Sequence, residues 1–255
     1  MSDFRLLAIH AHPDDESSKG AATTARYAAE GNEVLVLTCT GGERGDVINP
    51  AMDRPGIKEH MGEVRREEMA KAARALGVHH RWLGYVDSGL PDPVEGKSME
   101  ELLPEGCFAL QGDDTVAQEF VQVIREFRPH VIITYDENGG YPHPDHLMVH
   151  RASMIAWEKA GDAEYHPELG EAWTPLKLYY SHGFVYQRMK IFHDLLLEEG
   201  KTSPYGPMLA RWDTAFGDIM ARVTTQVECA DYFSNREEAL RCLLYTSDAA
   251  DDSLR

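Results

Sequence analysis

The chain has 255 residues, of which 43% are hydrophobic, and a formal net charge of −18 at pH 7. This length and apolar content suffice to bury the core of one α/β domain. The charge argues against nucleic acid or an anionic membrane surface as a partner, because both attract clustered lysine and arginine. No long apolar stretch offers a membrane span or a signal peptide, so we expect a cytoplasmic protein. The oligomeric state stays open.

Predicted strands and helices alternate along the first 136 residues. Short apolar runs predict strands, and apolar residues at a period of 3.6 predict helices that end near glycine or proline. The predicted order is strand 4–11, helix 17–29, strand 33–40, helix 64–78, strand 80–86, helix 115–127 and strand 130–136.

This alternation predicts an α/β fold with a Rossmann-like, mostly parallel sheet flanked by helices. In such sheets ligands bind beyond the carboxyl ends of the strands, so site residues should directly follow strands. Neither G-x-G-x-x-G after the first strand nor G-x-x-x-x-G-K-[ST] occurs, which removes the main support for a dinucleotide or P-loop protein.

We divide the chain into three predicted parts. Residues 1–160 form the core α/β metal-binding domain. Residues 161–241 form a substrate-covering extension of the same domain, with a strand at 177–184 and a helix at 185–199. Residues 242–255 resemble a translated sequencing adapter, and we expect them to be a non-native tail.

The segment AHPDDES, residues 11–17, directly follows the first predicted strand. His12 and Asp15 are three residues apart, which places an imidazole and a carboxylate on one side of a helical turn, where both can reach one ion. Asp14 is then left free. Alternatively, the proline and the aspartates only open and cap the next helix.

A second segment with the same pattern, YDENGGYPHPDH at residues 135–146, follows the strand at 130–136. His143 and His146 repeat the three-residue spacing, and Pro144 suits the first turn of a helix. Capping is again an alternative. Two H-P-D segments at the carboxyl ends of strands in one sheet favour a metal site.

A site of two imidazoles and one carboxylate leaves a coordination position open for water, as catalytic zinc sites do. Bound water then has a pKa of about 7 instead of about 15.7. Asp14 is the adjacent carboxylate that could serve as general base. Ferrous iron and manganese also accept this ligand set, so the residue types favour zinc without excluding other ions.

These motifs resemble the LmbE-like, or PIG-L-type, family of zinc-dependent N-deacetylases. The resemblance extends from Arg5 to about Arg241. It includes TGGERGD at 40–46, VRREEM at 64–69, VDSGL at 86–90 and TYDENGGYPHPDH at 134–146.

The resemblance implies specific roles for the site residues. One Zn²⁺ per chain, with Fe²⁺ as an alternative, would be held by His12, Asp15 and His146. Asp14 would be the general base. His143 would stabilise charge on the intermediate or act as the acid, and Tyr141 would hydrogen-bond the oxyanion.

The resemblance also implies a small thiol-sugar substrate. Asp46, Arg65 and Asp87 would contact the sugar and inositol hydroxyls, and Lys19 would be a further substrate contact. Without the resemblance, Arg65 and Lys19 would be read as ordinary surface charges.

The resemblance implies hydrolysis of the amide bond in S-conjugates of mycothiol, which releases an N-acetylcysteine conjugate (a mercapturic acid) and glucosaminyl-inositol in detoxification. Deacetylation of N-acetylglucosaminyl-inositol in mycothiol biosynthesis is the nearest alternative. An inactive metal- or sugar-binding protein is an alternative of another class, and a two-metal phosphoesterase is less favoured because further ligands are not found.

Overall fold

The computed structural model describes residues 4–45, 55–56, 58–181, 185–212 and 219–243. Its centre is a five-stranded sheet in the order β3-β2-β1-β4-β5, in which all neighbouring strands are parallel. The strands are β1 (Arg5–His10), β2 (Glu33–Thr40), β3 (His79–Tyr85), β4 (Val131–Thr134) and β5 (Lys177–Tyr180). The predicted α/β class with a mostly parallel sheet is confirmed.

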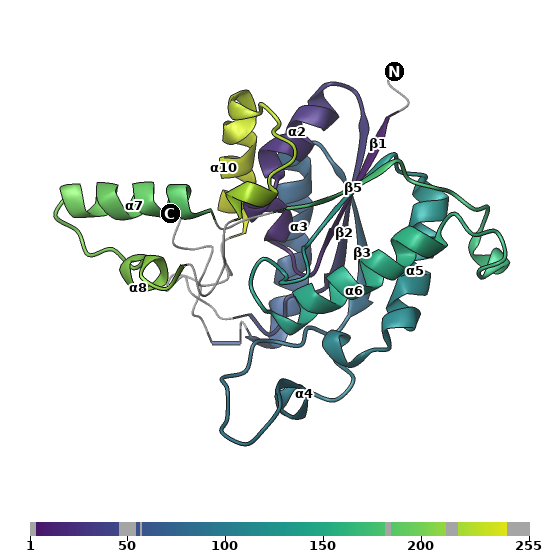
Figure 1. The fold of residues 1–255 in the computed structure, drawn as a ribbon, viewed down its shortest axis with the longest axis horizontal. Helices are drawn as coiled ribbons and strands as arrows, with labels where there is room; N and C mark the ends of the chain where they lie inside the picture. The colour runs from purple at the N-terminus through teal and green to yellow at the C-terminus, as the bar shows by residue number, and fades with distance from the viewer. Residues whose placement is uncertain (1–3, 46–54, 57, 182–184, 213–218, 244–255) are drawn as a thin grey trace.

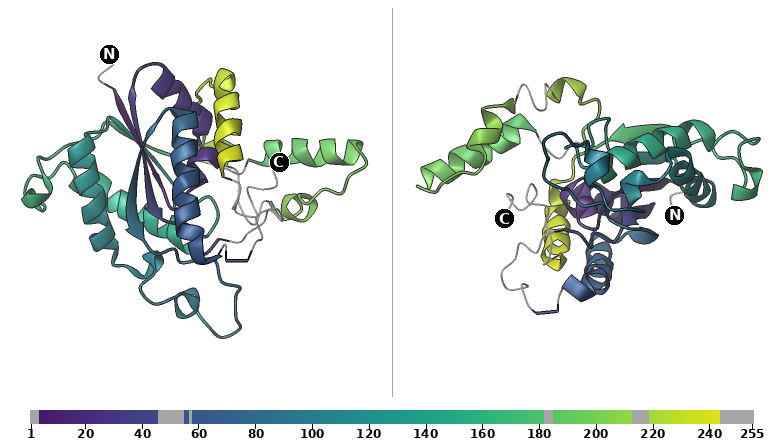
Figure 2. Two further views of the ribbon diagram at one scale, coloured as in Figure 1. Left: turned by 180° about the vertical axis from the view of Figure 1, so that it is seen from behind. Right: turned by 90° about the horizontal axis from the view of Figure 1, so that it is seen from below.

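The sheet is covered by helices on both faces, which explains why its central strands are almost continuously apolar (Figure 1). Side chains of a strand alternate between the faces. Leu7 and Ile9 of β1 therefore pack in one core cluster with α5 and α6, while Leu6 and Ala8 face α3. Figure 2 shows α2, α3 and α10 together on one side of the sheet.

The covering helices are α2 (Ala21–Ala29), α3 (Met61–Leu76), α5 (Asp113–Phe127), α6 (Pro144–Lys159) and α10 (Phe233–Cys242). The shorter helical elements are α1 (Asp15–Ser18), α4 (Met99–Leu102), α8 (Gly206–Leu209) and the 3-10 turns Lys58–His60, Phe108–Leu110, Pro167–Leu169, Met220–Arg222 and Ala230–Tyr232.

The predicted helix 17–29 is interrupted in the structure. It consists of α1, which begins earlier at Asp15, and α2, which begins at Ala21. Gly20 lies between them with a φ of 89°. A positive φ is inexpensive only for glycine, so this residue allows the chain to change direction directly behind the site.

The segment after residue 160 contributes to the sheet as well as lying outside it. Strand β5 pairs in parallel with β4, whereas α7 (Tyr186–Glu198) and α8 project away from the sheet (Figure 1). Helix α10 packs against α2 and α3, and Leu243 beyond it is buried in the same cluster. The rest of the predicted tail, residues 244–255, lies outside the described residues.

Across the described ranges, no helix has the length and apolar character needed to cross a membrane. The strand order places the topological switch between β1 and β4, because the chain runs outward from β1 to β3 and then returns to the other side of β1. Ligand sites in open α/β sheets form at this point. His12 follows β1, and His143 and His146 follow β4.

Candidate metal and active site

The predicted ligands His12, Asp15 and His146 come together at the switch point. Each offers one ligand atom, and the three atoms lie within 4.8 Å of one another. Asp15 Oδ2 lies 3.6 Å from Nδ1 of His12 and 3.4 Å from Nε2 of His146. All three residues are at most 9% exposed.

Both carboxylate oxygens of Asp15 accept hydrogen bonds. Its Oδ2 accepts hydrogen bonds from the His12 backbone amide (3.0 Å) and from the Tyr135 hydroxyl (2.5 Å). Its Oδ1 accepts one from Lys19 Nζ at 2.6 Å. Burial opposes ionisation, but the Lys19 ammonium and the two histidines hold the pKa of Asp15 well below its usual range.

His146 is oriented by the turn that precedes it. Its Nδ1 lies 2.8 Å from the Gly139 carbonyl, which can only accept, so Nδ1 carries the proton. Its ring stacks on Tyr135 with centroids 4.3 Å apart. Gly139 has a φ of 68°, and a Cβ there would lie 2.8 Å from the His146 Cβ. The turn therefore requires glycine.

The geometry fits a divalent metal. His146 Nε2 is buried and has no hydrogen-bond partner in the described structure, and burial lowers the pKa of this histidine, so the nitrogen keeps its lone pair. Ligand atoms about 2.1 Å from a tetrahedral zinc would be about 3.4 Å apart, close to the two separations measured from Asp15. A bound ion would give Nε2 the partner it lacks.

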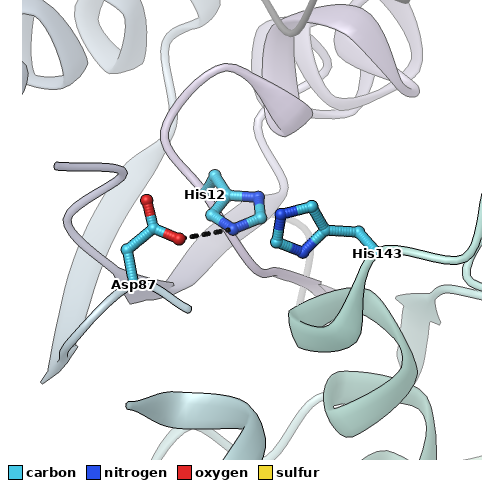
Figure 3. Close-up of side chains that lie close together, drawn as sticks. All are labelled: His12, Asp87 and His143. Atoms are coloured by element: carbon cyan, nitrogen blue, oxygen red, sulfur yellow. Dashed lines mark ion pairs between the residues drawn. The ribbon is translucent and has the colours of Figure 1, made fainter. Parts of the chain in front are cut away.

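His12 also belongs to a second group of potential ligands, with Asp87 and His143 (Figure 3). Its Nε2 lies 3.5 Å from Asp87 Oδ1 and 3.1 Å from Asp145 Oδ2. Burial lowers the pKa of His12, but hydrogen bonds to Asp145, Asp15 and Asp87 outweigh this and raise it well above 6.5. A metal must therefore displace a proton from this ring.

Asp14 occupies a strained backbone position beside the candidate ligands. Its φ is 120°, which is rare for a residue with a side chain and costs on the order of 1–3 kcal/mol. Its amide donates to Glu16 Oε2 at 2.9 Å, and its carbonyl accepts from the amides of Ser17 and Ser18. Such strain persists where the surroundings fix it, and it is common at functional sites.

Arg65 lies at the site and not on the surface. Its side chain is 2% exposed, and its Nη2 is 3.3 Å from Asp14 Oδ2. Gly42 makes room for it, because a Cβ there would lie 3.0 Å from Nη2. Nη1 of Arg65 also lies 3.8 Å from Oε2 of Glu68. Contact with substrate stays a prediction for Arg65.

His143 and Tyr141 flank the candidate ligands. His143 caps α6, since its Nδ1 accepts the Asp145 amide at 3.1 Å. Burial, together with the charge of the neighbouring His12, lowers the pKa of His143 to about 2. It is therefore neutral near pH 7, with its proton on Nε2. The Tyr141 ring lies edge-on to His146, with centroids 4.8 Å apart.

The other predicted substrate contacts are placed differently from one another. Lys19 is 4% exposed, and its ammonium is bound to Asp15. Asp87 is 2% exposed, lies beside His12 and accepts the amides of Arg44 and Gly89. Asp46 lies outside the described residues. For all three, substrate contact stays a prediction.

Three further residues of the site were not predicted from the sequence: Ser88, Tyr135 and Asp145. Tyr135 binds Asp15 and stacks on His146. Asp145 binds His12 and accepts hydrogen bonds from the amide and the hydroxyl of Ser88. One signal was available, because Tyr135 and Asp145 lie inside the segment 135–146 and Ser88 lies inside VDSGL.

Sequence comparison adds independent information. The PIG-L family, described as GlcNAc-PI de-N-acetylase, matches residues 7–157. Mycothiol S-conjugate amidase of Streptomyces coelicolor is 54% identical over 244 residues, which cover 94% of this chain and 82% of that protein. The 1D-myo-inositol 2-acetamido-2-deoxy-α-D-glucopyranoside deacetylase of Thermobifida fusca is 40% identical over 253 residues, with coverages of 94% and 82%.

A solved structure supports the fold. The N,N'-diacetylchitobiose deacetylase of Pyrococcus horikoshii superposes with a TM-score of 0.62 at 17% identity, over 96% of this chain and 72% of that one. The resemblance predicted from the two H-P-D motifs is confirmed: the chain belongs to the PIG-L (GlcNAc-PI de-N-acetylase) family and is a hydrolase of the amidase and deacetylase type.

Proposed function

We propose that this protein hydrolyses the amide bond of mycothiol S-conjugates, releasing an N-acetylcysteine S-conjugate and glucosaminyl-inositol. The 54% identity to the mycothiol S-conjugate amidase of Streptomyces coelicolor, over 94% of the chain, is the observation that carries this proposal. The arrangement of Asp14, Asp15, His12 and His146 at the switch point supports it, because amide hydrolysis needs a held water and a nearby base.

The ion proposed for the site is zinc, held by His12, Asp15 and His146. Two imidazoles and one carboxylate suit Zn²⁺ and leave a position open, and Fe²⁺ accepts the same set. When bound, such an ion supplies an activated water and polarises the substrate carbonyl.

The protein's own residues would handle the protons. Asp14 is the carboxylate beside the ligands that is not itself a proposed ligand, so it would accept a proton as the water oxygen adds to the amide carbon. When the C–N bond breaks, the same carboxyl would return that proton to the leaving amine. Arg65, 3.3 Å from Asp14, would keep the carboxylate in place during both transfers.

His143 would stabilise charge as a neutral donor. Its Nδ1 accepts the Asp145 amide, and its pKa is low, which favours donation of a hydrogen bond from Nε2 over transfer of a proton. A neutral histidine can act in this way on a developing oxyanion. Tyr141 would add a second hydrogen bond.

Deacetylation of the N-acetylglucosaminyl-inositol precursor is the second candidate. It is favoured by the 40% identity to the Thermobifida fusca deacetylase, which extends over 94% of the chain. The chemistry is the same, and only the acyl group differs.

The test is a comparison of two substrates at equal concentration. Purified protein reconstituted with zinc is incubated with a bimane S-conjugate of mycothiol, and separately with N-acetylglucosaminyl-inositol. We expect faster release of the bimane N-acetylcysteine conjugate than of acetate. Faster acetate release would favour the deacetylase, and no release from either substrate by a zinc-loaded protein would favour a binding protein.

A further inference from the structure

The two groups of potential metal ligands overlap at His12. In the first group, with Asp15 and His146, the nearer nitrogen of His12 is Nδ1. In the second, with Asp87 and His143, it is Nε2. A neutral imidazole has one nitrogen with a free lone pair, and the other carries the proton. The position of the His12 proton therefore decides which group can take an ion.

Asp145 determines where that proton lies. Its Oδ2 is 3.1 Å from Nε2 of His12, and the side chain is fully buried. An ionised carboxylate only accepts hydrogen bonds, so Nε2 must be the donor. The proton that an ion displaces is then the one on Nδ1, which lies 3.6 Å from Oδ2 of Asp15.

Ser88 holds the Asp145 carboxylate in this position. Its backbone amide donates to Oδ2 at 3.1 Å, and its hydroxyl donates to Oδ1. The hydroxyl oxygen itself accepts the Ala109 amide at 2.9 Å. Both oxygens of Asp145 are thereby fixed by the loop that follows β3, and Ser88 is 2% exposed.

Asp145 also fixes His143, through its backbone. The Asp145 amide donates to Nδ1 of His143 at 3.1 Å, so the proton of a neutral His143 lies on Nε2. In the second group His12 would then offer Nε2–H, and the free nitrogen of His143 already accepts a hydrogen bond. One residue therefore makes both imidazoles of this group unsuitable for a cation.

We propose that Asp145, held by Ser88, is a positioning residue that keeps the proton on Nε2 of His12 and thereby directs a divalent ion to the His12–Asp15–His146 group. This inference rests on the metal site of the proposed function. Hydrogen-bond partners of metal-bound histidines typically contribute about 10–100-fold to metal affinity.

The first test measures zinc affinity by competition with a chromophoric chelator. Asp145→Ala and Ser88→Ala are expected to weaken binding by about 10–100-fold, the aspartate variant more than the serine variant. Asp145→Asn keeps an acceptor oxygen and should lie between Asp145→Ala and the wild type. Asp87→Asn is not expected to weaken zinc binding.

Ser153→Ala is the matched control for Ser88→Ala. Ser153 lies on α6, two turns beyond His146, and is as buried as Ser88; its hydroxyl pairs with that of Thr134 on β4. Its removal should leave zinc affinity unchanged. If Asp145→Ala does not fold, as judged by circular dichroism, the zinc affinities of Ser88→Ala and Ser153→Ala are compared instead. The inference then requires weaker binding in Ser88→Ala alone.

The second test determines which nitrogen of His12 carries the proton. Nitrogen-15 NMR of histidine-labelled, zinc-loaded protein should show a protonated Nε2 on His12, and this signal should change in Asp145→Ala. Zinc affinities of Asp145→Ala and Ser88→Ala equal to that of the wild type would overturn the inference, as would a marked loss of affinity in Asp87→Asn. A wild-type protein that binds no divalent ion would instead overturn the metal site itself.

Discussion

The two ends of helix α6 differ in how completely their buried polar groups are satisfied. At the C-terminal end, the Arg125 guanidinium donates to the carbonyls of Ala160, Asp162, Tyr165 and His166. At the N-terminal end, Nε2 of His146 is buried without a hydrogen-bond partner in the described structure. Helix α6 thus ends in a dense hydrogen-bond network around Arg125. Its first turn carries a buried nitrogen that makes no hydrogen bond in the described structure.

We relate this difference to the roles of the two ends: the C-terminal end stabilises the fold, whereas the N-terminal end can bind a ligand. A buried charge whose nitrogens all donate hydrogen bonds, as the three nitrogens of Arg125 do, holds a loop in place. A buried nitrogen whose lone pair accepts no hydrogen bond lowers the stability of the fold, unless another group binds to it. Its position beside Asp15 and His12 makes a divalent ion the group that we expect there.

The largest effect should follow from His146→Ala, which removes the buried Nε2 that lacks a hydrogen-bond partner in the described structure. We expect amide hydrolysis to fall by at least roughly 10⁴-fold, as it does when one member of a catalytic unit is lost. His150→Gln is the control, because His150 lies one turn further along α6 and bonds to the Tyr135 carbonyl. Retention of even a tenth of the activity by His146→Ala would contradict the assignment.

Asp14→Asn should come next. It keeps the shape of the side chain and removes the base, so hydrolysis is expected to fall by about 10³-fold. Zinc content, measured by atomic emission on the same sample, should equal that of the wild type. Loss of zinc together with activity would show that Asp14 is a ligand and not the base.

Arg125→Met tests the hydrogen-bond network at the C-terminal end of α6. Several buried carbonyls would lose their donor, and we expect the free energy of unfolding in urea to drop by about 3 kcal/mol. Zinc affinity of the folded variant should be unchanged, because the contacts of Arg125 are all at the far end of α6. A variant as stable as the wild type would show that the network contributes little.

The smallest effect concerns pH. Burial lowers the pKa of His80 to about 4, so the unfolded chain, with a pKa near 6.5, binds more protons between these values. The stability that depends on neutral His80 is complete above about pH 6.5 and is lost as the pH falls toward 4. His80→Gln should therefore lose less stability between pH 7 and pH 5, by about 1 kcal/mol after allowance for partial exposure. Equal losses in urea titrations would contradict this.

Much of the fold could be predicted, because continuous apolar runs such as residues 33–40 occur where a strand is covered on both faces. The metal segments could also be found, since both follow strands that meet at the switch point. The structure brings the predicted ligands His12, Asp15 and His146 together, and their binding of a metal ion stays a prediction.

The remaining features depend on contacts between distant segments. Arg65 and Arg125 lie in charged or amphipathic helices, where an arginine normally faces solvent, and nothing nearby in the sequence indicates what covers them. Asp145 resembles a helix cap, and its partner Ser88 is 57 residues away. The pair of Lys19 and Asp15 is the exception, since four-residue spacing on a helix favours such an ion pair.

The most direct test of the central claim is a zinc titration of metal-free protein, followed by hydrolysis of the bimane S-conjugate. If His12, Asp15 and His146 hold one catalytic ion, activity should rise linearly and reach its plateau at one zinc per chain. Full activity in the metal-free protein, or a plateau only at two zinc ions per chain, would contradict the account.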